Sequence, residues 1–484
     1  MTSGSSVPRR GRMIRNFMHL GLGQVVTTIL TILLNAAVAR ALSPGDFGLM
    51  YLLTSISTFA YVIVDWGHGP YIIREASRFP DRAGELLGSA MLVRTLVALG
   101  ATVVILFATW AMGYDLRTRI LSALLTIGWL PQYLALSVGW IFRSRERMDR
   151  EAMINVVLKL SALLVSLACL ALGGRVLALM LAWTIAGCLT LAVALFMYRR
   201  MEMPAISANS NTGRELLRGG VPIFAMALAV AVQPFVNANI LFKMATPEVV
   251  GWFGAAWVIA GTLLAPAMVI DSAMYPRLSA AAGNAAEFKR SFAMSFRPLL
   301  LLAILVSIGT WLFAEVPVGL IYGMAKFQPA AEILRAFALV LFLVFIDIFF
   351  SMAILASGRS VRLAGIKVAS VVITTGLVFM LVPLMQARGG NGGIGVMYAM
   401  AVGELPMFVA SVYLLRKAFD GGTINDVLRS LATGAATIAL FHFLPEQSPF
   451  LEIPLCVAVF GVLALALGAV RKADIETLLP ARFR

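Results

Sequence analysis

Long apolar runs, each separated from the next by a short polar stretch, dominate this sequence. A helix needs about 20 apolar residues to cross a hydrocarbon core of about 30 Å, and most of the runs reach that length. They lack the period-two alternation of membrane barrel strands, and lipid accepts only helices or closed barrels as spanning structures. The runs therefore predict an all-α polytopic membrane protein with about fourteen transmembrane helices. The predicted spans are residues 17–39, 47–69, 86–112, 118–141, 151–172, 175–198, 216–242, 249–275, 294–319, 331–357, 363–385, 394–415, 429–444 and 451–470.

The composition excludes a water-soluble fold and most enzymes. Hydrophobic residues make up 60% of the 484 positions and charged residues 13%, against about 45–50% and about 25% in soluble proteins. The polar loops are too short to form a catalytic domain, and the sequence has no Walker A or His-Glu-x-x-His motif. All three cysteines lie within predicted spans, which argues against a disulfide framework or a thiolate metal site. We expect a protein that is not an enzyme and that uses no cofactor or metal.

Lysine and arginine residues gather on one side of the predicted membrane. The loop after span ten contributes Arg359 and Arg362 to this side, and the stretch after span twelve contributes Arg416 and Lys417. The positive-inside rule makes this the cytoplasmic side. Both termini are then cytoplasmic, in a multi-pass protein of the inner (cytoplasmic) membrane. The net charge of +15 thus reflects topology, and we expect no nucleic-acid partner.

A short motif before span two recurs six spans later. Ser43-Pro44 corresponds to Thr246-Pro247, and Arg94 in span three corresponds to Arg297 in span nine. Because an even number of spans separates the copies, the repeat is parallel, with a pseudo-two-fold axis along the membrane normal. Two such six-helix lobes suit alternating access. The predicted organisation is a basic cytoplasmic N-tail (1–16), an N-lobe (17–200), a cytoplasmic linker (201–215), a C-lobe (216–416), and two further spans with a cytoplasmic C-tail (417–484).

The motif region resembles a known family of exporters. The stretch from Ala39 to Gly48, followed by Asp65-Trp-Gly67-His-Gly69 and Ile73-Arg74-Glu75, resembles the opening of the polysaccharide-transporter branch of the multidrug/oligosaccharidyl-lipid/polysaccharide (MOP) exporter superfamily. The resemblance implies a flippase for polyprenyl-diphosphate-linked repeat units of O-antigen (lipopolysaccharide) or exopolysaccharide. It implies two lobes around a cavity whose cationic groups meet the lipid diphosphate. The family usually has leucine where Trp66 and His68 stand here.

The resemblance also implies partners and leaves two other functions open. The partners are the polyprenyl-linked saccharide, membrane lipids, a polysaccharide polymerase and a chain-length regulator. The first alternative is a cation-coupled multidrug exporter of the same superfamily, whose drug sites favour acidic and aromatic cavities. The second is a membrane scaffold of a polysaccharide assembly complex that transports nothing.

Four cations lie within predicted spans on their cytoplasmic halves. They are Arg94, Lys159, Arg297 and Lys367. Each costs about 2.5–3.5 kcal/mol at mid-membrane, so such residues are functional candidates. We predict that they bind the substrate diphosphate, for which the planar arginine fork is well suited. The alternative is that their long side chains extend to the cytoplasmic headgroups.

Two acids lie near the centres of spans. Asp347 in span ten and Glu404 in span twelve have no basic residue in their own helices. A carboxyl group at that depth faces a wet cavity or stays protonated. We predict a role in coupling to protons or sodium ions, or in substrate contact, with a hydrogen bond between helices as the alternative.

Two further acids precede arginines near the cytoplasmic ends of spans two and eight. Asp65 precedes Arg74, and Asp271 precedes Arg277. These residues predict gate-forming ion pairs, with plain solvation at the interface as the alternative.

Prolines within spans predict kinks. Pro131, Pro222, Pro234 and Pro266 each remove a backbone donor. Gln233 and Asn237 flank Pro234, so span seven is predicted to bend and line the cavity through Gln233, Pro234 and Asn237. Simple hydrogen bonding between helices is the alternative.

Overall fold

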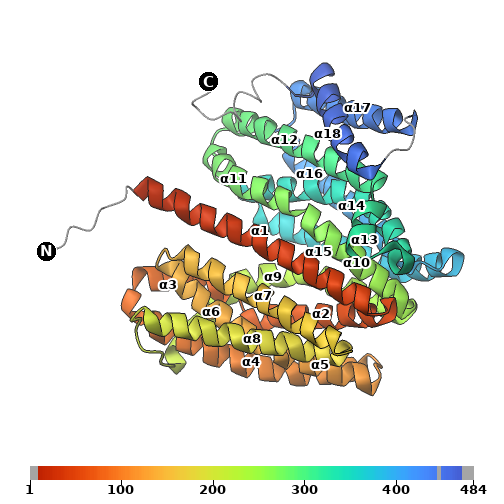
Figure 1. The fold of residues 1–484 in the computed structure, drawn as a ribbon. Coiled ribbons are helices and arrows are strands. Elements are labelled where there is room, and N and C mark those ends of the chain that lie inside the picture. The colour runs from red at the N-terminus through yellow and green to blue at the C-terminus, as the bar shows by residue number, and fades with distance from the viewer. Residues whose placement is uncertain (1–8, 444–447, 471–484) are drawn as a thin grey trace. The chain divides into compact units, whose positions relative to one another are not determined.

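The computed structural model describes residues 9–443 and 448–470, and the described residues form helices with no strand (Figure 1). Within these described ranges, twelve stretches are long and apolar enough to cross a membrane. The prediction of an all-α polytopic membrane protein is confirmed. Two helices predicted as spans seven and thirteen, α9 and α17, are not among the twelve. The number fourteen therefore stays a prediction.

The chain divides into two compact units, Met1–Phe242 and Lys243–Arg484. In the first, α4 packs on α2, α5 and α6, while α7 packs on α1 and α8. Its helices are α1 (Arg9–Ala41), α2 (Pro44–Asp65), α3 (His68–Arg78), the 3-10 turn η1 (Pro80–Arg82), α4 (Ala83–Ala111), α5 (Leu116–Gly128), α6 (Leu130–Ser144), α7 (Met148–Ala171), α8 (Val176–Arg200) and α9 (Ser210–Met244).

The second unit is organised around α14, which contacts α10, α11, α12 and α16. Phenylalanine side chains of α12 and α14, including Phe292 and Phe349, pack against one another in its core. Its helices are α10 (Pro247–Leu263), α11 (Ala265–Ala281), α12 (Ala285–Leu312), α13 (Glu315–Ile321), α14 (Met324–Ala356), α15 (Ser360–Gly389), α16 (Gly392–Leu415), α17 (Gly421–Phe443) and α18 (Pro449–Ala466).

The boundary between the units falls within α9, just after Phe242. The sequence instead places the boundary of the lobes at the linker, residues 201–215. The predicted lobes and their repeat stay predictions.

Three predicted spans are broken in their interior, and a fourth, residues 294–319, is divided near its end, where α12 stops at Leu312 and α13 begins at Glu315. Pro131 and Pro266 stand in the first turns of α6 and α11, so the helices before them end at Gly128 and Leu263. A proline is tolerated in the first turn of a helix because a backbone N–H at that position would have no hydrogen-bond partner within the helix. The third break separates α2 from α3 at Trp66 and Gly67. Both residues have left-handed backbones, with φ of 46° and 68°, a conformation that is uncommon for a side chain as large as tryptophan.

The two copies of the repeated turn differ in their capping. Ser43 caps α2, because its hydroxyl accepts a hydrogen bond from the Asp46 N–H at 3.1 Å. Thr246 precedes α10 without a side-chain cap. The prolines stand in the first turn of both helices, as the sequence predicts.

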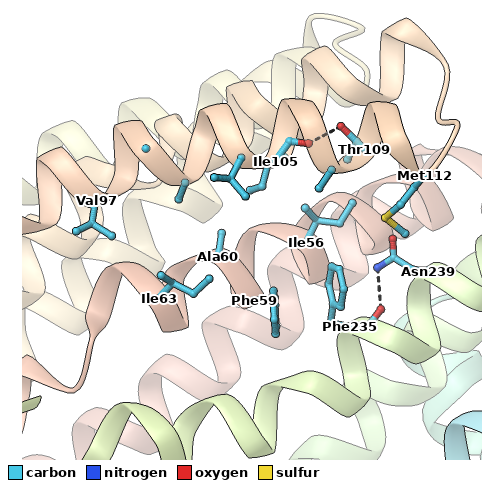
Figure 2. Close-up of a pocket in the computed structure, with 14 residues that line it drawn as sticks. Ile56, Phe59, Ala60, Ile63, Val97, Ile105, Thr109, Met112, Phe235 and Asn239 are labelled. Atoms are coloured by element: carbon cyan, nitrogen blue, oxygen red, sulfur yellow. Dashed lines mark hydrogen bonds between the residues drawn. The ribbon is translucent and has the colours of Figure 1, made fainter. Parts of the chain in front are cut away.

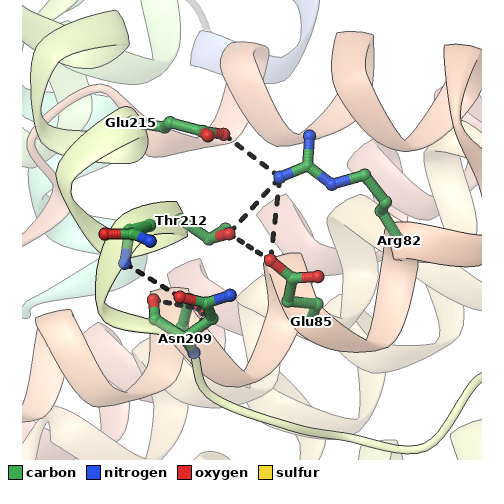
Figure 3. Close-up of polar contacts among 7 residues, drawn as sticks. Arg82, Glu85, Asn209, Thr212 and Glu215 are labelled. Atoms are coloured by element: carbon green, nitrogen blue, oxygen red, sulfur yellow. Dashed lines mark hydrogen bonds and ion pairs between the residues drawn. The ribbon is translucent and has the colours of Figure 1, made fainter.

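The predicted linker packs along α4. The Ser207 N–H donates to the Gly84 carbonyl at 3.3 Å, and a Cβ added at Gly84 would stand 2.1 Å from the Ala205 carbonyl oxygen. Glycine is therefore required for this close approach. Figure 3 shows the polar contacts that join the start of α9 to α4: Arg82 pairs with Glu215 at 3.1 Å, and the Thr212 hydroxyl binds Glu85.

The turn before α17 offers a test of stability against pH. Asp420 accepts hydrogen bonds from the backbone N–H and the hydroxyl of Thr423, at 2.7 and 2.8 Å, and lies 3.3 Å from Lys289. These contacts lower the pKa of the Asp420 carboxyl to about 2. Because the folded-state pKa is depressed, the stabilisation is complete above the unfolded value of about 3.9 and is lost as the pH falls through 2.

We expect Asp420→Ala to lower the thermal unfolding temperature of the detergent-solubilised protein at pH 7. The difference from wild type should shrink between pH 4 and pH 2. Asp420→Asn should fall between the two, because asparagine still caps a helix but carries no charge. A difference that stays constant down to pH 2 would contradict the assignment.

Candidate functional site

The first unit contains a buried arginine that binds a carboxylate. Arg94 of α4 has no exposed side-chain surface, and its guanidinium donates to Asp65, the last residue of α2. The same guanidinium donates to the Tyr133 carbonyl at 2.5 Å and to the Ser137 hydroxyl at 2.6 Å, both in α6. The guanidinium carbon of Arg94 lies 4.2 Å from the centroid of the Trp140 ring. Arg94 thus ties α2, α4 and α6 together.

This geometry changes the role expected for Arg94. The sequence predicts a cation open to a diphosphate, whereas the side chain is fully enclosed and already has a carboxylate partner. An arginine in a low-dielectric interior needs such a partner, and Asp65 stands at the end of the neighbouring helix. In this structure, Arg94 supports the packing of three helices.

Asp65 and Arg74, the first expected gate pair, are not paired with each other in this structure. Arg74 is exposed and pairs with its neighbour Glu75 at 3.3 Å, while Asp65 pairs with Arg94. Between the two residues the helix is broken at Trp66 and Gly67, both with left-handed backbones.

The second gate prediction concerns α11. The side chain of Asp271 lies outside the described residues. Arg277 is exposed, and its guanidinium lies 3.3 Å from the sulfur of Met294.

Lys159 differs from the other predicted cations. It lies near the middle of α7, is half-buried, and makes no ion pair or hydrogen bond with a described residue. An ammonium group without a carboxylate partner at this depth is costly, so it marks a candidate for binding an anionic ligand.

Arg297 of α12 has a carboxylate partner in α17. Its Nε lies 3.1 Å from Asp426 Oδ2, and both side chains are nearly buried. The pair ties α17 to the core of the second unit. Asp426 is not among the residues predicted from the sequence, because the predicted span thirteen begins at residue 429 and leaves this acid in a loop.

Three charged groups meet in the second unit. Lys367 Nζ of α15 lies 3.0 Å from Asp347 Oδ2 of α14, and the Ser351 hydroxyl donates to the other carboxylate oxygen at 3.1 Å. Glu404 of α16 lies close enough to interact electrostatically with both. Lys367 is thus half of an ion pair rather than an open cation. The cluster has two carboxyl groups and one ammonium group, so one carboxyl group has no matching charge.

Tight packing of α15 against α16 fixes the position of Glu404. The Ser370 hydroxyl donates to the Gly403 carbonyl at 2.9 Å, and a Cβ added at Gly403 would meet the Thr374 hydroxyl at 1.9 Å. Pro406 follows within the same helix. The backbone beside Glu404 is therefore held against α15. Pro406 has no N–H, so the helix lacks one backbone hydrogen bond next to Glu404.

An apolar cavity of about 330 Å³ lies between α2, α4 and α9 in the first unit. Figure 2 shows Phe59 of α2 and Phe235 of α9 on one side and Ile105 of α4 on the other. The two aromatic rings stack with centroids 4.4 Å apart. Near one end, the Asn239 amide donates to the Phe235 carbonyl at 2.7 Å. The lining suits a hydrocarbon chain better than a sugar.

The predicted kink in span seven lies beside this cavity. Pro234 stands inside α9, and Gln233 donates to Asn237 at 2.7 Å. None of these three residues lines the cavity, whose α9 wall is formed by Phe235 and Asn239. The hydrogen bond between Gln233 and Asn237 joins two residues one turn apart in the same helix.

A family model described as "Polysaccharide biosynthesis protein" matches residues 13–282. The comparison with curated proteins found no match.

Several solved transporter structures share the fold. The lipid II flippase MurJ in an inward closed conformation aligns over 94% of this chain and 99% of its own, with a TM-score of 0.69 and 12% identity. An inward-facing multidrug resistance MATE family transporter of the MOP superfamily aligns over 83% and 98%, with a TM-score of 0.64 and 15% identity. A MOP superfamily transporter from Pyrococcus furiosus aligns over 84% and 95%, with a TM-score of 0.54 and 15% identity.

Proposed function

Because the chain belongs to the polysaccharide biosynthesis protein family, we propose that it is a flippase that moves polyprenyl-diphosphate-linked oligosaccharide repeat units across the cytoplasmic membrane. The family match supports this substrate class, and we propose that the substrate is a precursor of surface polysaccharide such as O-antigen or exopolysaccharide. The fold, shared with MOP-superfamily transporters, supports transport by alternating access.

The contacts of the four predicted cations support one role for Lys159 and another for the other three. Lys159, which has no carboxylate partner among the described residues, is our candidate for the first contact with the substrate diphosphate. Arg94, Arg297 and Lys367 each pair with a carboxylate. A phosphate would bind any of these three cations only by displacing its carboxylate. We therefore assign the three ion pairs a structural role, in which they hold the helices in this conformation.

The cluster of Asp347, Lys367 and Glu404 supports coupling to a cation. Lys367 neutralises one carboxylate, which leaves one negative charge to be matched by a proton or a sodium ion. An intramembrane carboxyl group of this kind is a plausible carrier of the coupling ion.

The proposal places the chain in the cytoplasmic membrane with both termini in the cytoplasm. Its partners are the lipid-linked saccharide and membrane lipids, together with a polysaccharide polymerase and a chain-length regulator that act on the translocated units.

Deletion of the gene tests the proposal. We expect surface polymer to be lost and lipid-linked repeat units to accumulate on the cytoplasmic side of the membrane. Labelling of the sugars that are exposed on the cytoplasmic face of membrane vesicles measures this accumulation. Normal surface polymer in the deletion strain would overturn the proposal.

A lysine variant separates the flippase from the two alternatives. Lys159→Ala should lower export at least tenfold, because an ion pair with a diphosphate is lost. Lys326→Ala, on the predicted external side, is the matched control and should export normally. A drug exporter or a scaffold would tolerate Lys159→Ala as long as the protein inserts. Export at the wild-type rate by this variant would therefore count against Lys159 as the phosphate contact.

A further inference from the structure

A small cleft on the second unit is rich in basic side chains. It has a volume of about 190 Å³ and lies where the ends of α14 and α16 meet the start of α15. Its lining residues are Arg359, Arg362, Tyr413, Leu414, Arg416 and Lys417. No carboxylate is among them. The sequence places all four cations on the cytoplasmic side of the membrane.

Two of the arginines are held in position by their neighbours. Arg359 donates to the Leu414 carbonyl at 2.6 Å, which fixes the start of α15 against the end of α16. The guanidinium carbon of Arg416 lies 4.3 Å from the centroid of the Tyr413 ring. Arg362 and Lys417 are exposed beside them. Two of the four cations are therefore held at the wall of the cleft.

The four cations make no ion pair with a described residue, although they line one cleft together. Several other basic residues on the predicted cytoplasmic side each have a carboxylate within 3.3 Å: Arg74 with Glu75, Arg82 with Glu215, Arg143 with Glu151, Arg147 with Asp149 and Lys289 with Asp420.

The partial charges at the helix ends offset only a small part of this positive charge. The C-terminal ends of α14 and α16 each carry about half a negative unit charge, and the start of α15 carries about half a positive unit charge. Against four basic side chains, about three and a half positive charges stay unmatched. Like charges held this close repel one another, so the cleft gains stability when it holds an anion.

We propose that this cleft binds the phosphate group of a membrane lipid. Its position at the ends of three membrane helices favours a ligand that is part of the bilayer, and basic pockets between transmembrane helices recognise lipid headgroups in this way. The volume is below the roughly 300–1,000 Å³ of sites for drug-sized ligands. The cleft therefore accommodates a phosphate or diphosphate group and excludes an oligosaccharide.

The site goes beyond the proposed function. Binding of a lipid phosphate follows from the cleft itself, whichever molecule the protein transports. A role in delivering a polyprenyl diphosphate to the transport pathway rests, in addition, on the proposed flippase function. The test below measures binding alone, so its failure and the failure of the flippase proposal are distinguishable.

Native mass spectrometry of the purified full-length protein tests the site. The probes are phosphatidylglycerol, phosphatidylcholine of the same chain length, undecaprenyl phosphate and inorganic diphosphate. The site variant is Arg362→Gln/Arg416→Gln/Lys417→Gln, which spares Arg359 and its hydrogen bond. The matched control is Arg199→Gln/Arg200→Gln/Arg214→Gln, which removes the same charge from exposed positions on the same predicted side.

We expect wild type and control to retain phosphatidylglycerol and undecaprenyl phosphate, and the site variant to bind both about 100-fold more weakly. Preference for undecaprenyl phosphate over phosphatidylglycerol would further support delivery of the substrate lipid. Equal binding by all three proteins would overturn the proposal. Inorganic diphosphate binding as tightly as the lipids would overturn the assignment to a membrane lipid.

A measurement on the unmodified protein covers the case in which the site variant fails to fold. Lys417 should be acetylated more slowly in vesicles of phosphatidylcholine with 20 mol% phosphatidylglycerol than in pure phosphatidylcholine, with Lys326 as the reference. Equal acetylation of Lys417 in both vesicles would again overturn the proposal.

Discussion

Replacement of Arg94 by alanine should destabilise the protein by about 3 kcal/mol, the lower end of the range for breaking a buried ion pair, because the Asp65 side chain keeps 36% of its surface exposed. The variant leaves Asp65 without its partner and removes the donor that joins α4 to the Tyr133 carbonyl and the Ser137 hydroxyl. Folded yield and thermal unfolding in detergent measure the effect.

Three further variants make the Arg94 prediction specific. Arg94→Lys should be nearly as damaging, because one ammonium group cannot reproduce the planar fork that reaches both α2 and α6. Arg94→Met combined with Asp65→Asn should recover part of the loss, since no unpaired charge is left. Arg74→Ala is the control and should change stability by less than about 0.5 kcal/mol. A stable Arg94→Ala protein that no longer transports would instead support the original prediction of diphosphate binding.

Removal of Lys367 should have the second large effect. Lys367→Met leaves Asp347 and Glu404 as two carboxyl groups without their cation, and we expect a loss of about 2 kcal/mol in stability, between the values for exposed and buried pairs, because the Lys367 side chain keeps 37% of its surface exposed. Lys367→Met combined with Asp347→Asn should recover most of it. A double variant as unstable as Lys367→Met would show that the lysine acts through other contacts.

Glu404→Gln separates coupling from folding. It removes the carboxyl group that has no matching charge and leaves the pair of Lys367 and Asp347 intact. We expect normal folding and transport that no longer responds to the coupling gradient, measured in vesicles with a pH gradient and a sodium gradient imposed in turn. A variant that responds to the same gradient as wild type would exclude Glu404 as the carrier of that ion.

The sequence predicts helices well here because the bilayer leaves the backbone few alternatives. Pro131 and Pro266 also indicate where spans are interrupted, and both stand at the start of a new helix. The break after Asp65 carries a weaker signal. Gly67 marks it, but nothing in the sequence indicates a left-handed tryptophan, because that conformation is stabilised by contacts with a helix 150 residues further along.

The charged residues show where sequence reasoning ends. The sequence predicts Arg94 and Lys367 as cations within spans, but their partners come from other helices, and the distance between helices cannot be read from the spacing of residues. Asp65 was identified as well, but with Arg74 as its partner. A rule that assigns each intramembrane cation the acid at a similar depth in a neighbouring span would have found Asp65 for Arg94.

The contacts of Trp66 limit where α9 can bend. The Trp66 indole N–H donates to the Leu217 carbonyl at 2.8 Å, and its ring stacks on Phe224 with centroids 4.2 Å apart. A Cβ added at Gly220 would stand 2.0 Å from the Trp66 carbonyl oxygen, so the two backbones touch. The N-terminal turns of α9 are therefore held against the end of α2 by these contacts. We expect any swing of this helix during a transport cycle to begin beyond these turns, with Pro234 as its flexible joint, and to leave the linker on α4 unmoved.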